Sequence, residues 1–118
     1  MRYLSIFKSP ERDTPPTEQE MAVMGKYIEE RARAGVLLSA EGCLPSAYGS
    51  RVRRSGDKVG VTDGPFAEAK EVVGGLALFQ VNSKEEAIEE ARKFLEVAGT
   101  DGECEIRQLY EVPALEPA

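Results

Sequence analysis

Two helix-start signals constrain the fold of this 118-residue chain more than any other feature of its sequence. Residues 17–20 and 83–86 both read as capping boxes, in which a hydroxyl residue stands three positions before a glutamate. Each box opens a stretch with apolar residues at helical spacing, and the two stretches end at Gly35 and Gly99. We therefore expect two helices, and the segments around them must supply the strands.

Four further stretches and a hairpin show the alternation or the short apolar runs that are typical of β-strands. The strands are expected over residues 2–8, 36–40, 72–81 and 103–112, and the hairpin over residues 52–61. Within the third strand, Gly74-Gly75 predicts a bulge or a close backbone approach. The resulting order is β-α-β-hairpin-β-α-β, which predicts an α+β fold: a ferredoxin-like split β-α-β with an inserted β-hairpin.

Composition limits the classes of function. A net charge of −6 argues against non-specific nucleic-acid binding, which needs a surplus of Lys and Arg. No apolar run approaches the roughly 20 residues that span a bilayer, and the N-terminus lacks a signal-peptide pattern. We expect a cytoplasmic protein that binds neither nucleic acid nor membrane. One domain is expected over residues 1–112, followed by a loose tail at 113–118.

The chain contains no histidine, so the commonest general base near neutral pH is missing. Cys43 and Cys104 are far apart and form no Cys-x-x-Cys pair, which favours two reduced thiols over a disulfide or a metal site. With no histidine and only two cysteines, a zinc site would need carboxylate ligands as well. We expect no metal and no cofactor.

Two of the expected strands carry apolar residues on both of their faces. Leu4 and Ile6 lie opposite Tyr3 and Phe7 in the first strand, and residues 76–79 are apolar throughout. An antiparallel sheet with helices on one face should have polar residues on the other, so something must cover it. The simplest cover is a second copy of the chain, which predicts a homodimer with Tyr3, Phe7 or Phe79 near the contact. The alternative is that the inserted hairpin folds back over the sheet.

The most distinctive short motif is Asp63-Gly64-Pro65-Phe66, which connects the hairpin to the third strand. It is followed by Glu68, Lys70 and Glu71, and then by Gly74-Gly75 leading into the apolar strand. With the preceding Arg33-Ala34-Gly35, Glu41-Gly42 and Leu44-Pro45, this pattern resembles the DGPF-domain proteins of the YCII-related family. The resemblance extends from Met1 to about Val112.

The resemblance implies a dimeric α+β barrel made of ferredoxin-like halves. It leaves the function open, since most members have none assigned. Some YCII-like relatives carry a His–Asp pair linked to lyase-type chemistry, and this chain lacks the histidine. Other DGPF proteins are associated with alternative sigma factors, which implies a regulatory or sensing context.

Asp63 has two interpretations. Its carboxylate can accept backbone N–H bonds and hold the turn, while Gly64 tolerates the backbone restricted by Pro65. Alternatively, Asp63 faces a cleft at the end of the sheet, together with Glu41, as a general base or ligand acceptor. The basic cluster at residues 51–54 reads either as a charged hairpin edge or as an anion clamp. The candidate ligand-binding residues are Phe7, Glu41, Gly42, Arg51, Asp63, Gly64, Pro65, Phe66 and Gly75, with Asp63 the candidate catalytic residue.

Three functions follow from these patterns. The first is a dimer that binds or senses a small molecule without turnover. The second is a lyase, isomerase or hydrolase that uses Asp63 with Tyr or Arg in place of histidine. The third is an interaction module for another protein such as a sigma factor. The lack of histidine and of a recognised nucleophile motif favours the first over the second.

Overall fold

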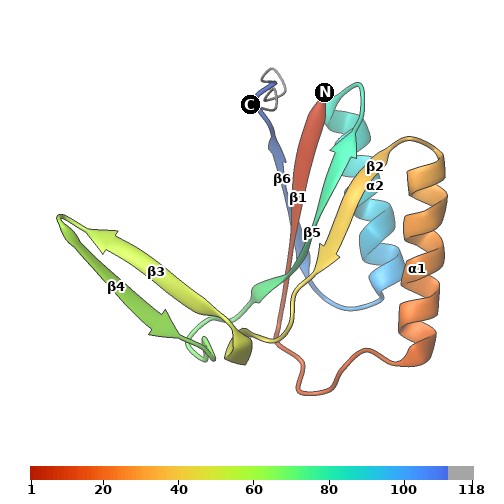
Figure 1. The fold of residues 1–118 in the computed structure, drawn as a ribbon. Coiled ribbons are helices and arrows are strands. Elements are labelled where there is room, and N and C mark those ends of the chain that lie inside the picture. Colours follow the sequence, from red (N-terminus) through yellow and green to blue (C-terminus); the bar gives the residue numbers. More distant parts are fainter. Residues whose placement is uncertain (112–118) are drawn as a thin grey trace, which may run out of the picture.

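Residues 1–111 are described by a computed structural model, in which two helices cover one face of an antiparallel sheet and a two-stranded arm stands apart (Figure 1). Along the chain the elements are β1 (Arg2–Ser9), α1 (Glu18–Arg33), β2 (Leu37–Gly42), the 3₁₀ turn η1 (Ser46–Tyr48), β3 (Ser50–Ser55), β4 (Lys58–Asp63), β5 (Val72–Gln80), α2 (Lys84–Ala98) and β6 (Glu103–Gln108).

The main sheet has the strand order β2-β5-β1-β6, and each neighbouring pair is antiparallel. The two central strands are therefore the first strands of the two β-α-β units, with β2 and β6 at the edges. This is the split β-α-β arrangement, so the ferredoxin-like α+β prediction is confirmed. β3 and β4 pair only with each other, as the inserted hairpin.

Both helices begin and end close to where the sequence signals predict. The Thr17 hydroxyl accepts the Glu20 N–H at 3.1 Å, and the Glu20 carboxylate accepts the Thr17 N–H at 3.1 Å, which completes the capping box. At the second helix the Ser83 hydroxyl accepts the Glu86 N–H. The Glu86 carboxylate accepts the backbone N–H of Asn82, the residue before Ser83, so this capping box is shifted by one residue. Gly99 ends α2 in the left-handed conformation, with φ 67°.

The core lies between the sheet and the helices. Tyr3, Phe79 and Leu37 are buried there against Ile28 of α1 and Ala87 of α2. Side chains alternate along a strand, so Tyr3 and Phe79 cannot also reach the helix-free face. The expectation that Tyr3, Phe7 or Phe79 lies near a contact on that face is therefore wrong. Phe7 too lies on the helix side, with its ring against Phe94 of α2.

The helix-free face nevertheless has an apolar centre. The strand register pairs Leu4 with Leu78 and Ile6 with Leu76, which places these four residues together on the two central strands. On the edge strand β6, Arg107 and Glu105 lie beside Leu4 and Ile6. An apolar centre with a charged rim is the usual composition of a protein–protein contact surface. The expectation of apolar residues on both sheet faces is thus met.

The β3–β4 hairpin, here called the arm, projects away from the main sheet on its helix-free side (Figure 1). All residues of the arm's two strands are exposed, so the arm does not fold back over the sheet of its own chain. The radius of gyration is 16.3 Å, compared with about 13 Å for a compact domain of this length. The arm is the main departure from a compact shape.

Several boundaries differ from the sequence predictions. The last strand ends at Gln108, and Tyr110 lies beyond it with 91% of its surface exposed. The sequence alternation runs on to residue 112, but β6 ends earlier because it pairs only with β1, which begins at Arg2. Tyr3 lies opposite Gln108, and the Leu109 N–H donates to the Arg2 carbonyl. The predicted tail at 113–118 lies outside the described residues. No helix among residues 1–111 has the length and apolar character needed to cross a membrane.

Candidate functional site

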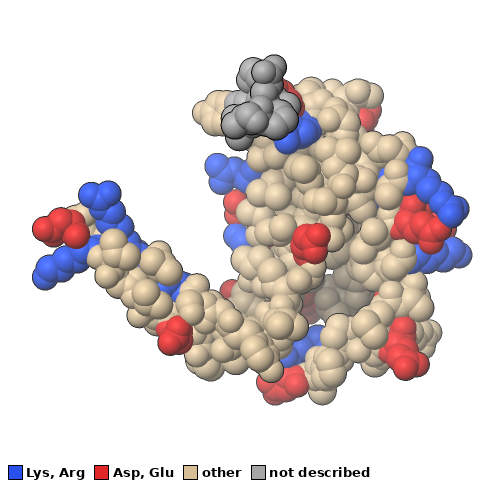
Figure 2. All heavy atoms as spheres, in the orientation of Figure 1, with Lys and Arg blue, Asp and Glu red and all other residues tan. Residues whose placement is uncertain are grey.

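A cleft of about 1200 Å³ opens between α1 and the sheet. Its floor includes Phe7, Ala40 and Ala77 from the central and edge strands, and its walls include Met24 and Phe94 from the two helices. The surface is visibly hollowed beside α1 (Figure 2). A cleft with mostly apolar walls and a few polar groups is the usual form of a small-molecule site.

Aromatic side chains meet in the middle of the cleft. The rings of Phe7 and Phe94 pack edge to face with centroids 5.1 Å apart, and Tyr27 lies 6.5 Å from Phe94. The Tyr27 hydroxyl donates to the backbone carbonyl of Glu90 at 3.2 Å. Burial, with a smaller contribution from the Glu90 carboxylate, raises the pKa of Tyr27 to about 12. Tyr27 is therefore neutral at physiological pH and already bonded.

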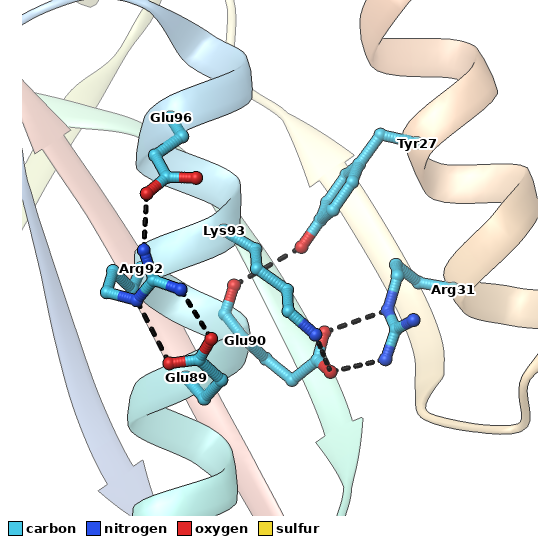
Figure 3. A network of polar contacts seen from close by, with 7 residues as sticks. All are labelled: Tyr27, Arg31, Glu89, Glu90, Arg92, Lys93 and Glu96. Atoms are coloured by element: carbon cyan, nitrogen blue, oxygen red, sulfur yellow. Dashed lines mark hydrogen bonds and ion pairs between the residues drawn. The ribbon is translucent and has the colours of Figure 1, made fainter.

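The cleft exists because α1 packs closely along only part of its length. The Arg31 guanidinium binds both carboxylate oxygens of Glu90 on α2, with Nε 2.9 Å from Oε2, while the Lys93 Nζ lies 3.9 Å from Oε1 (Figure 3). At the other end of α1, Met21 is 56% exposed and α1 contains no fully buried residue. The helix is held near its C-terminal half and stands off the sheet at its N-terminal half.

The charges around the cleft have one predominant sign. Among residues 1–111, Arg12 is the only Lys or Arg that lines the cleft, and Arg12 binds Glu20 at 2.8 Å. This ion pair, helped by the Thr17 N–H, lowers the pKa of Glu20 to about 2. The other lining carboxylates are Glu11, Asp13 and Glu41. The described residues of the cleft therefore offer a ligand carboxylates and no unpaired Lys or Arg.

The DGPF segment is held by a relay of hydrogen bonds on the opposite side of the cleft's mouth. The Glu11 carboxylate accepts from both the backbone N–H and the hydroxyl of Ser46, which lowers the pKa of Glu11. The hydroxyl oxygen of Ser46 in turn accepts the Phe66 N–H at 3.0 Å. A Cβ at Gly64 would lie 1.7 Å from the Ser46 carbonyl oxygen. Gly64 is thus required by close packing, whereas the sequence interpretation relied on unusual backbone angles.

Asp63 does not reach the cleft. It is exposed at the end of β4, accepts a hydrogen bond from the Ser50 hydroxyl at 2.7 Å, and lines neither of the two cavities. The Phe66 N–H expected to donate to Asp63 donates to Ser46 instead. Glu41 lines the cleft and Asp63 does not, so the shared cleft of the alternative interpretation is not formed by these two carboxylates. Asp63 therefore joins the two strands at the base of the arm, and its partner is the Ser50 hydroxyl and not a backbone N–H of the turn.

Arg51 joins the arm to the DGPF segment. Its guanidinium carbon lies 3.8 Å from the centre of the Phe66 ring, and its Nη1 binds the Glu68 carboxylate. The pKa of Glu68 is lowered by this bond. Arg51 and Phe66 also line a second cavity of about 680 Å³ at the base of the arm. Because Arg51 is already paired, it is a poor clamp for an anion.

The candidate residues divide into three groups. Those that line the cleft are Phe7, Glu41, Gly42 and Gly75. Arg51 and Phe66 line the cavity at the base of the arm. Asp63, Gly64 and Pro65 line neither, and the Gly64–Pro65 peptide bond is cis. Among residues 1–111 no group of three or more Cys, Asp or Glu has the arrangement of a metal site.

Sequence reasoning missed most of the cleft walls. Met24, Tyr27 and Phe94 belong to the apolar residues at helical spacing in the two helices, a pattern that predicts burial against a sheet. Their apolar character gave no sign that part of α1 stands off that sheet. The role of Glu11 and Ser46 was also missed, because they are 35 residues apart and belong to segments that read as loops.

Comparisons with known proteins identify the family of this chain. The profile of the YCII-related domain matches residues 1–112. An uncharacterized protein of Rhizobium meliloti (strain 1021) is 34% identical over 101 residues, which cover 86% of this chain and 78% of that protein. The chain belongs to the YCII-related family. Within that family, this chain has a ferredoxin-like α+β fold.

Proposed function

We propose that this protein binds a small molecule in the cleft between α1 and the sheet and acts as a sensing dimer. The observation that carries the proposal is the cleft itself, about 1200 Å³ in volume with Phe7, Phe94 and Met24 in its walls. Natural ligand sites are typically about 300–1000 Å³, so the cleft has room for a ligand of ordinary size. Methionine walls suit it to ligands of varied shape.

The charges define the ligand class. Because Arg12 is paired with Glu20 and the other charged lining groups are carboxylates, an anionic ligand would find no free partner. A ligand with an apolar, flat body and a neutral or positively charged head fits both the aromatic walls and the acidic mouth. Tyr27 is neutral and already donates to a carbonyl, so it contributes an apolar ring more than a polar handle.

A matched pair of fluorescent probes tests this proposal. N-phenyl-1-naphthylamine is neutral, and anilinonaphthalene sulfonate has the same aromatic body with an added negative charge. We expect the neutral probe to bind at least about tenfold more tightly, since desolvating an unpaired sulfonate opposes binding. Equal affinities, or tighter binding of the sulfonate, would show the electrostatic part of the proposal to be wrong.

Variants locate the probe. Met21→Glu adds a charge to a cleft-lining residue that is 56% exposed, and we expect it to weaken binding of the neutral probe by about tenfold. Ile88→Glu is the control, because Ile88 is a similarly exposed apolar residue on α2 that does not line the cleft. If the two variants have the same effect, the probe does not occupy the cleft.

The enzyme alternative predicts a different result for Asp63. Since Asp63 lies outside the cleft and bonds to Ser50, Asp63→Ala should leave probe affinity within about twofold of wild type, as for a surface change. Loss of binding or of any detected turnover in both Asp63→Ala and Asp63→Asn, with the fold of each retained by circular dichroism, would restore Asp63 as a site residue.

The dimer part of the proposal rests on the helix-free sheet face. Leu4, Ile6, Leu76 and Leu78 form its apolar centre, and a second copy packed sheet to sheet would cover all four. Leu78→Glu places a charge in that centre and should convert the dimer to a monomer in sedimentation experiments. Ile88→Glu on the helix layer should leave it dimeric. A wild-type chain that is monomeric at every accessible concentration would overturn this part.

A further inference from the structure

The arm exposes three valine side chains to solvent. Val52, Val59 and Val61 are 69%, 64% and 65% exposed. The register pairs Val52 with Val61, and strand alternation puts Val59 on the same face. Arg53 and Thr62 lie on the opposite face. The arm therefore has one face with three valines, here called the valine face, on which Arg54 also lies opposite Val59, and one polar face.

A two-stranded hairpin alone is only marginally stable in water, so an exposed valine face needs a cover. Contacts at its base nevertheless fix the direction in which the arm projects. Arg51 stacks on Phe66 and binds Glu68, Asp63 accepts from Ser50, and the Gly64 N–H donates to the Gly49 carbonyl at 2.8 Å. These contacts aim the arm outward on the helix-free side of the sheet (Figure 1).

Charge points to a second copy of this chain as the cover. Residues 50–63 contain four Lys or Arg and two Asp, a net charge of +2, while the whole chain has −6. The rest of each protomer therefore has a net charge of −8. Basic side chains gather at the far end of the arm (Figure 2). A basic arm that reaches across an acidic body is electrostatically complementary to it.

Geometry agrees with charge. The arm and the helix-free face enclose an open angle, and the cavity of about 680 Å³ at the arm's base is lined by Val73 and Lys8 of the sheet as well as by Tyr48. A protomer seated on the helix-free face lies within this angle. Two-fold symmetry then lets both arms reach across at the same time.

We infer that the β3–β4 arm is a clasp: in the dimer, the valine face of each arm packs against the body of the other protomer. This inference rests on the dimer proposed above and adds a second contact surface to it. It also accounts for the length and exposure of the arm, which the fold of one chain does not require.

Val61→Gln and Thr62→Gln form a matched pair for testing the clasp, because the two residues are neighbours on β4 and face opposite ways. Neither substitution changes the net charge. We expect Val61→Gln to raise the dimer dissociation constant by about tenfold and Thr62→Gln to change it by less than about twofold. Equilibrium sedimentation of both variants gives the constants, and circular dichroism checks that each folds.

Trypsin provides a second readout, since Arg51, Arg53, Arg54 and Lys58 lie in the arm. We expect cleavage in the arm to slow as the wild-type dimer forms with rising protein concentration, and to stay fast in the monomeric Leu78→Glu variant. Equal cleavage of the arm in monomer and dimer would overturn the clasp.

The outcomes separate the clasp from the sheet contact. A dimer lost in Leu78→Glu but unaffected by Val61→Gln keeps the sheet contact and rejects the clasp, leaving the arm free for another protein. A dimer lost in Val61→Gln but retained in Leu78→Glu keeps the arm contact and rejects the sheet-to-sheet arrangement. A monomeric wild type rejects both.

Discussion

At the scale of single residues, Gly64 and Gly75 are explained by close approach of other backbone atoms. Gly64 lies against the Ser46 carbonyl, and a Cβ at Gly75 would lie 2.7 Å from the Glu41 carbonyl oxygen. Gly74 is the extra residue where β5 bulges beside Phe7, as the Gly-Gly pair predicted. At Gly64 the DGPF segment approaches η1, and at Gly75 β5 approaches β2, too closely for a side chain to fit.

Gly64→Ala is expected to destabilise the protein by about 1–3 kcal/mol, because the added methyl collides with backbone that cannot rotate away. Gly60→Ala is the control, since Gly60 lies on β4 with no atom within 4 Å of an added Cβ. It should change the free energy of unfolding by no more than about 0.5 kcal/mol. Urea denaturation measures both, and equal losses would refute the packing role of Gly64.

At the scale of elements, α1 decides the shape of the cleft, and Glu90 holds α1 in place. The Glu90 side chain is 7% exposed and that of Arg31 is 23% exposed, so their ion pair is shielded far more than the others on the helices. Glu90 lies on the buried side of α2, where a stripe of apolar residues was expected. This buried charged residue is the one through which α2 binds Arg31 of α1.

Glu90→Gln should destabilise the fold by about 1–3 kcal/mol, because it leaves the Arg31 charge without its carboxylate while the partly exposed guanidinium keeps some solvation. The matched control is Glu29→Gln, which breaks the exposed Glu29–Arg33 pair on α1, the helix that carries Arg31. That pair should contribute no more than about 0.5 kcal/mol. Thermal or urea denaturation distinguishes the two, and similar small losses would mean that Glu90 does not anchor α1.

The start of α1 should be sensitive to acid. The pKa of Glu20 is lowered to about 2 by Arg12 and by the Thr17 N–H, below the usual 4.5. A depressed folded-state pKa contributes stability that is present above about pH 4.5 and is lost as the pH falls through about 2. In a carboxyl NMR titration, Arg12→Ala should move the Glu20 midpoint upward, and Arg33→Ala, at the other end of the helix, should not. An unchanged midpoint in Arg12→Ala would contradict the assigned cause.

At the scale of the whole molecule, two surfaces remain uncovered in one chain: the apolar centre of the helix-free face and the valine face of the arm. The arm itself projects on the side of the helix-free face, away from the helices (Figure 1). A fold that leaves two such surfaces uncovered is suited to association, since burying them removes apolar area from water.

The melting temperature should therefore rise with protein concentration, because association stabilises the folded state by mass action. Each tenfold rise in concentration adds about 1.4 kcal/mol per dimer when the folded dimer unfolds to separate chains. Leu78→Glu should melt lower and at a temperature independent of concentration. Scanning calorimetry over a wide concentration range is the measurement, and a concentration-independent wild type would argue against the dimer.

The sequence by itself determined the elements and their order. The capping boxes, Gly35 and Gly99 are local signals, and local hydrogen bonds and backbone preferences decide helix ends wherever the chain goes afterwards. Period-2 alternation located the strands, and the apolar residues on both faces of β1 and β5 indicated a sheet that needs two covers. The family resemblance on the DGPF segment agrees with the matched profile.

Only the tertiary structure decided which residues meet. It placed Tyr3 and Phe79 on the helix side, separated Asp63 from Glu41, and joined Glu11 to Ser46 across 35 positions. Alternation and helical spacing show which side chains share a face. They do not show which face another element covers or how closely that element packs. The cleft and the outward direction of the arm arise from such distant contacts, which is why sequence reasoning found the fold and missed most of the site.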